Sequence, residues 1–167
     1  LVGSEMCIRD SLYRSLVQPV ADGVCDFLQK ALDGFSALPG EEQQAQKKSY
    51  ADDGVAKIID YIYENFDLFK ILLTSGETHI YQEFLHRIID LDIACTTRFI
   101  EQTGNDAFTS GRLTPEVAHI LSCAFYSGFF EIVMHDMPQE QAHEHIQRLR
   151  KFYNIGWKNI FEGDGID

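Results

Sequence analysis

Three Glu-x-x-His patterns in the chain have a spacing that could serve metal chemistry. Two residues three positions apart lie on one face of a helix, and di-iron helical bundles bind their metals with two such pairs plus two further glutamates. The pairs here are Glu83/His86, Glu116/His119 and Glu140/His143. They are more frequent than the composition of the chain would predict.

The neighbours of these pairs argue against a metal site. On a helical wheel, the first pair shares its face with Arg87, Asp90 and Arg98, and the third pair lies on the polar side of its helix. Only His119 is directed toward a plausible interior. We therefore predict solvated pairs, with no metal and no cofactor, and a metal-binding helical bundle stays as a less favoured alternative.

Motifs of other catalytic classes are missing from the sequence. It contains no Gly-rich phosphate loop, no GxSxG and no HExxH. Ser75 and Gly76 read as a helix end rather than a nucleophile elbow, because no strand pattern precedes them. We predict no catalytic residues and no enzymatic activity.

Composition indicates one domain of modest size. The chain has 167 residues, 45% of them hydrophobic, and a domain of this size buries roughly two-thirds of its unfolded surface. No run approaches the ~18 uninterrupted apolar residues of a membrane span, and no signal peptide is recognisable. The cysteines at 7, 25, 95 and 123 have no metal-type spacing. We expect reduced thiols in a cytoplasmic protein.

Charge excludes DNA binding by this chain itself. The formal net charge is −12, from 14 basic and 26 acidic residues. Because affinity for duplex DNA depends on Lys and Arg set against phosphates, an acidic chain without a basic face should not hold DNA.

The hydrophobic pattern predicts an all-α bundle of about five to six helices. We expect helices over residues 12–32, 42–65, 67–74, 79–102, 115–134 and 139–161, with Pro19 kinking the first. Thr114 and Pro115 form a typical helix start. We expect the native domain to span residues 12–161 and an acidic tail to span residues 162–167. Residues 1–11 (LVGSEMCIRDS) look like adapter read-through and lie outside the fold; an authentic, disordered N-terminal arm is the alternative.

Two segments carry a resemblance to a known family. Residues 61–76 (YIYENFDLFKILLTSG) pair the end of one amphipathic helix with a short, strongly apolar one, and residues 12–17 (LYRSLV) open a long helix. These segments and the helices after them resemble the C-terminal effector-binding and dimerisation domain of TetR/AcrR-family transcriptional regulators. The resemblance implies a DNA-binding helix-turn-helix domain before Leu12, a homodimer, and a small apolar or amphipathic effector that relieves repression.

The helix over residues 115–134 is apolar on two opposite faces and must therefore be buried on both. The face with hydrogen-bonding groups suits a ligand cavity, and the face with small residues suits packing against a partner. The expected ligand-binding residues are Phe69, Phe84, Ile88, His119, Cys123, Tyr126 and Phe130. The expected dimer interface, which pairs the last two helices as a dimerisation hairpin, comprises Val117, Leu121, Ala124, Gly128, Ile146, Leu149, Tyr153 and Trp157.

Two alternatives remain at this stage. Both faces could be ordinary core of a monomer, or the chain could be a helical dimeriser or adaptor without a ligand. A packed core with no void above ~30 Å³, the volume of a single water, would favour the adaptor. A cavity of ~300 Å³ or more would favour the sensor.

Overall fold

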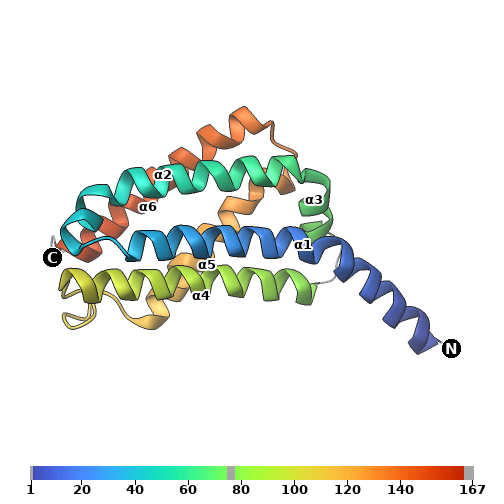
Figure 1. Cartoon of the computed structure of the whole chain (residues 1–167), viewed down its shortest axis with the longest axis horizontal. Coiled ribbons are helices and arrows are strands. Elements are labelled where there is room, and N and C mark those ends of the chain that lie inside the picture. Colours follow the sequence, from blue (N-terminus) through green and yellow to red (C-terminus); the bar gives the residue numbers. More distant parts are fainter. Residues whose placement is uncertain (1, 75–77, 164–167) are drawn as a thin grey trace.

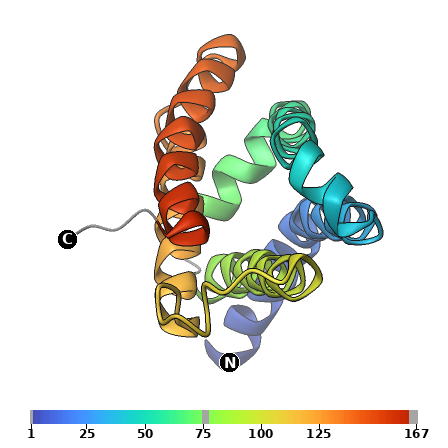
Figure 2. The same cartoon turned by 90° about the vertical axis from the view of Figure 1, so that its left-hand side faces the viewer.

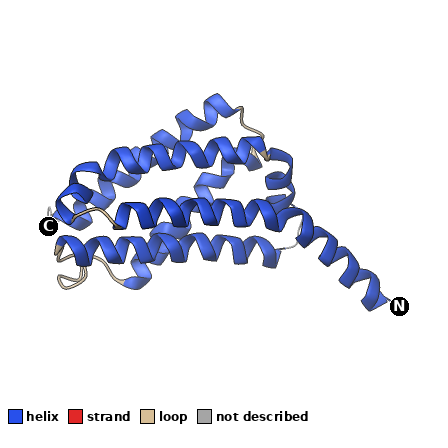
Figure 3. Ribbon diagram, viewed as in Figure 1, coloured by secondary structure: helices blue, strands red, loops and turns tan. Residues whose placement is uncertain are grey.

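The computed structural model of the chain describes residues 2–74 and 78–163, which form six helices and no strand (Figures 1 and 3). The expected all-α bundle is thereby confirmed. The helices are α1 (Val2–Ser36), α2 (Gly40–Glu64), α3 (Phe66–Thr74), α4 (Thr78–Thr103), α5 (Pro115–Met134) and α6 (Gln139–Glu162).

Helix α5 begins and ends where the sequence predicts, because its start is specified locally. The Thr114 side chain accepts a hydrogen bond from the Val117 backbone N–H at 3.3 Å, and Pro115 occupies the first turn. An N-cap oxygen satisfies one of the four backbone donors that a helix start leaves unpaired.

Helix α1 differs most from its predicted bounds. It begins at Val2 rather than Leu12, continues through Pro19 and ends at Ser36. Its first turns project from the bundle (Figure 1), and the Ile8 side chain is 68% exposed. Apolar periodicity indicates burial against a neighbour rather than helicity, so it did not indicate this projecting part of the helix. The predicted helix end at Ser75–Gly76 and most of the acidic tail lie outside the described residues.

The helices enclose a space rather than stacking in two layers. Helices α1 and α4 lie side by side, and α2 runs along α1 (Figure 1). Seen from the end of the bundle, α5 and α6 form a hairpin on one side, and the short α3 bridges from α2 toward this hairpin (Figure 2). Five helices can therefore contribute side chains to a common interior.

The core has two parts. The larger cluster joins residues of α1 to α6, and its central rings are Phe69, Phe84 and Phe130. The smaller one surrounds Phe99 and includes residues of the 104–114 loop. This loop is fastened to the end of α6 by Asn105 Nδ2, which donates to the Phe161 carbonyl at 2.9 Å. Residues of both clusters line the cavity described below.

Candidate functional site

A cavity of about 250 Å³ lies between α1, α2, α4, α5 and α6, where the two core clusters meet. This volume is several times the ~30 Å³ of one water and approaches the ~300 Å³ lower end of typical ligand pockets. It exceeds the packing voids of an ordinary core, which are seldom larger than a water. The interior of this bundle is therefore not filled by its own side chains.

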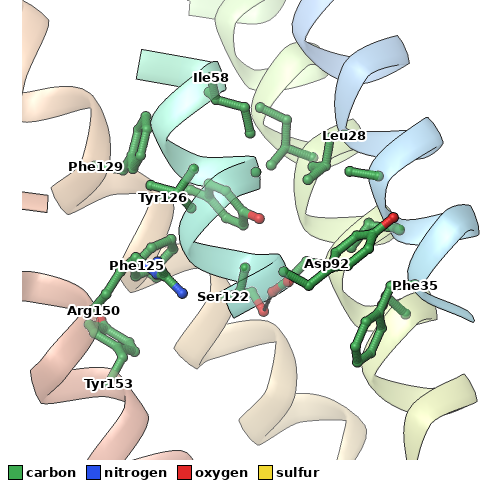
Figure 4. A pocket seen from close by; sticks show the side chains of 18 of the residues that line it. Leu28, Phe35, Ile58, Asp92, Ser122, Phe125, Tyr126, Phe129, Arg150 and Tyr153 are labelled. Atoms are coloured by element: carbon green, nitrogen blue, oxygen red, sulfur yellow. Dashed lines mark hydrogen bonds between the residues drawn. The ribbon is translucent and has the colours of Figure 1, made fainter. Parts of the chain in front are cut away.

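The walls of the cavity are mainly apolar and aromatic (Figure 4). Helix α1 contributes apolar side chains spaced about one helical turn apart, and α5 contributes aromatic side chains to the wall. The apolar lining comprises Val24, Leu28, Ala31, Leu32, Phe35, Val55, Ile58, Ile88, Leu121, Phe125, Phe129, Phe130 and Trp157. Such walls favour an apolar or aromatic guest because its burial removes apolar surface from water.

One wall carries a carboxyl group. Asp92 of α4 lies in the stripe otherwise formed by Phe84, Ile88, Cys95 and Phe99, so its side chain faces the interior. Ser122 Oγ donates a hydrogen bond to Asp92 Oδ2 at 2.7 Å (Figure 4). Burial raises the pKa of the Asp92 carboxyl, and the hydrogen bond from Ser122 opposes this rise only in part.

Tyr126 adds a second polar group beside Asp92. Its hydroxyl is directed toward the middle of the pocket (Figure 4), and it makes no hydrogen bond to any residue in the described part of the chain. Burial raises the pKa of this phenol well above its usual value, and the nearby Asp92 adds to the effect. The hydroxyl therefore stays protonated and can both donate to and accept from a guest.

Two cationic side chains border the cavity, and each already has a partner. Arg150 of α6 is buried and forms an ion pair with Asp52 of α2. The Lys47 ammonium lies 4.0 Å from the ring centroid of Phe161 and 4.6 Å from that of Phe99. Burial lowers the pKa of Lys47 to about 8.

The thiol at the cavity wall is not an activated nucleophile. Cys95 is buried, and this burial raises its pKa to about 11. Reactive cysteines need a depressed pKa, which a cationic neighbour or a helix N-terminus supplies. Asp92 acts in the opposite direction here.

The predicted ligand-binding residues do not share one cavity. Ile88, Tyr126 and Phe130 line it, whereas Phe69 and Phe84 belong to the packed core beside it. Cys123 is partly buried and His119 is exposed; neither lines the cavity.

The error for His119 has a geometric cause. A wheel shows which residues share a face, but it does not show which neighbour covers that face. In the bundle α4 lies alongside this part of α5, and the His119 ring stacks at 6.5 Å on the ring of His86 at the outer rim of that contact. The polar group near Tyr126 in the cavity is Asp92 rather than His119. The position of Asp92 within an apolar stripe of α4 could have indicated this from the sequence.

The Glu-x-x-His pairs lie on the surface, and only His86 and His119 of the first two pairs approach each other. Glu83 is exposed and forms an ion pair with Arg14 at 3.2 Å, and His143 contacts Asp60 at 3.0 Å. Within the described ranges, no three His, Cys, Asp or Glu side chains come together as metal ligands would.

The predicted dimer residues divide into three groups. Val117 and Ala124 are exposed. Ile146 is fully covered within the single chain and Gly128 faces Leu149 of α6, so neither is available to a partner. Leu121, Tyr153 and Trp157 line the cavity, and Leu149 is partly buried against Gly128. Of the predicted interface residues, Val117 and Ala124 are therefore the ones whose side chains the single chain leaves exposed.

Comparison of the chain with protein-family models, curated protein sequences and solved structures finds no match. Helix α5 is the one helix in residues 2–74 and 78–163 that is long and apolar enough to cross a bilayer. The core helix of a soluble bundle passes the same test.

Proposed function

We propose that the chain is the effector-binding and dimerisation domain of a TetR/AcrR-like transcriptional repressor. In this proposal it is a cytoplasmic, non-enzymatic homodimer, and DNA is contacted by a helix-turn-helix domain that precedes α1. The observation that carries the proposal is the cavity of about 250 Å³, whose apolar walls hold a few inward polar groups. That combination is typical of small-molecule sites.

Helix α1 is the element suited to transmit binding. It lines the cavity with Val24, Leu28 and Ala31 and continues beyond the bundle toward the N-terminus (Figure 1). A ligand that prefers one position of α1 over another changes the spacing of the two DNA-reading domains in a dimer. A coupling free energy of about 1–3 kcal/mol is enough for a roughly 5- to 150-fold change in operator affinity.

A direct test is binding of a neutral aromatic probe, 1-naphthalenemethanol, followed by the fluorescence of Trp157, the one tryptophan. Trp157 lines the cavity, so a guest should change its emission. Ala31→Phe fills the cavity and should abolish binding. Ala94→Phe, an exposed position of α4, makes the same change outside it and should leave binding intact. Unchanged binding by Ala31→Phe would contradict the proposal, and no binding by the native chain would favour the ligand-free adaptor.

The proposed dimer surface is the outer face of the α5–α6 hairpin. Ile120, Phe152 and Ile155 are 63%, 73% and 66% exposed, and Val117 and Ala124 lie on the same face of α5 as Ile120. Large exposed apolar side chains on neighbouring helices are typical of interaction surfaces. A twofold axis through this face would produce a four-helix bundle.

Sedimentation velocity tests this surface. Phe152→Glu should convert a dimer to a monomer, because the charge would have to be buried in the interface. Gln147→Glu makes the same change in charge at an exposed position on another side of α6 and should leave the dimer intact. A native chain that sediments as a monomer, or a dimer that survives Phe152→Glu, would refute this assignment.

A further inference from the structure

The carboxyl group of Asp92 stands in the middle of an apolar stripe, which is an unfavourable place for it in an empty protein. In the described part of the chain its hydrogen-bond partner is Ser122, and no cationic side chain lies within ion-pair distance of it. A carboxyl group removed from water without a countercharge has a desolvation cost, which a cation in the cavity would offset.

We propose that the cavity binds an amphipathic organic monocation, a protonated amine carried on an aromatic or apolar body. This inference rests on the proposed function of the cavity as a ligand site. The ammonium group is held by the Asp92 carboxylate and the unpaired Tyr126 hydroxyl, and the body lies against the aromatic walls from α5 and α1.

Three features favour a cation over an anion. The nearest cationic candidates for an anion, Arg150 and Lys47, are already occupied by an ion pair and by two aromatic rings, respectively. Aromatic faces such as those of Phe125 and Phe129 attract cations through their quadrupoles. The net charge of −12 also concentrates cations rather than anions near the protein.

Binding of such a ligand is coupled to one proton. In the empty cavity, burial favours the protonated form of Asp92. When the ammonium arrives, the carboxyl group loses its proton to solvent and becomes the carboxylate that faces the cation. Charge balances because one positive charge enters the cavity and one leaves. Affinity should therefore rise with pH until Asp92 is already ionised in the free protein.

The other titratable groups around Asp92 whose pKa values are shifted should not release a proton below pH 7. The pKa values of Cys25 on α1 and Cys95 on α4 are about 11, and that of Tyr126 on α5 is raised well above its usual value. Lys47 on α2 has a pKa of about 8. Measurements between pH 5 and pH 7 therefore isolate the carboxyl group.

The test uses three probes that differ in charge and share one body: 1-naphthalenemethylamine, 1-naphthalenemethanol and 1-naphthoate. We expect the native chain to bind the amine roughly tenfold or more tightly than the alcohol, as a charge-assisted hydrogen bond requires. Titration calorimetry at pH 6 in two buffers of different ionisation enthalpy should show release of up to one proton for the amine and none for the alcohol.

The matched variants are Asp92→Asn and Asp53→Asn, the latter at an exposed position of α2 outside the cavity. Asp92→Asn should remove both the preference for the amine and the proton release while still binding the alcohol. Asp53→Asn should keep both. The proton release is measured on the native chain, so the test survives if Asp92→Asn does not fold.

The outcomes separate the two proposals. Equal affinity for amine and alcohol, tightest binding of the naphthoate, or a preference that persists in Asp92→Asn would overturn the cationic ligand and leave the cavity as a ligand site. If none of the three probes binds, the proposed function fails, and this inference fails with it.

Discussion

Replacing Phe84 by alanine should lower the free energy of unfolding by about 3–5 kcal/mol, the usual cost of removing a buried phenylalanine. The Phe84 side chain is 2% exposed, and its ring centroid lies 6.4 Å from that of Phe69 and 5.5 Å from that of Phe130. Each lost ring pair accounts for about 0.5–1.5 kcal/mol of the total. These rings join α3, α4 and α5, so no single helix can move to close the void.

Urea unfolding followed by circular dichroism measures this loss. With a slope of about 2 kcal/mol/M, the midpoint should fall by roughly 1.5–2.5 M. Leu16→Ala is the control, because that side chain is 48% exposed and leaves no enclosed void; it should cost less than about 1 kcal/mol. Since Phe84 does not line the cavity, the folded variant should still bind 1-naphthalenemethanol. A midpoint shift for Phe84→Ala no larger than that of Leu16→Ala would refute this account of the core.

Stability should also change on substitution of a buried glutamine, of two helical glycines and of a partly buried lysine. Gln43→Ala should destabilise by about 1–3 kcal/mol in thermal melts, because its buried amide donates to a backbone carbonyl at 2.7 Å and to another side chain at 2.6 Å. Gly54→Ala should stabilise α2 by about 0.5–1 kcal/mol since nothing lies within 4 Å of the new Cβ, whereas Gly23→Ala should destabilise because its Cβ would collide with the Tyr61 ring and hydroxyl. The pKa of Lys47 is about 8 in the fold and ~10.4 when unfolded, so this group contributes stability that rises with pH between these values, whereas Cys25 and Cys95, whose pKa values are raised to about 11, contribute in the opposite direction. The stability of the native chain relative to Lys47→Met, measured in urea titrations, should therefore rise with pH in this range, and a difference that does not change with pH would contradict the assignment.

The sequence was sufficient for the helices whose limits are set by local chemistry. Thr114 and Pro115 define the start of α5, and the Pro138 turn defines the start of α6, so both were located correctly. Helix α1 was the exception at its N-terminus. There the chain projects from the bundle, and apolar spacing reports burial rather than helicity.

The sequence could not show which neighbouring helix covers each face of α5. A wheel divides α5 into sides, yet in the bundle this helix contacts α3, α4 and α6 at different points along its length. His119 and Tyr126 therefore have different surroundings despite sharing a face on the wheel: the first reaches the surface and the second faces the cavity. These surroundings depend on where two helices cross. That position is a property of the pair of helices and cannot be read from the sequence of one of them.

Asp92 shows what kind of signal does survive in a single sequence. Ile88, Ile89 and Cys95, each about one turn from Asp92, are buried, so an aspartate at this position conflicts with its surroundings. A buried carboxyl would be replaced without loss by leucine if the stripe served packing alone, because an apolar side chain avoids the desolvation cost. The hydrogen bond from Ser122 does not remove this cost, since the pKa of Asp92 stays raised. A polar residue that breaks the apolar period of a core helix therefore indicates the cavity wall more directly than the apolar residues that continue the period, because those also form the packed core.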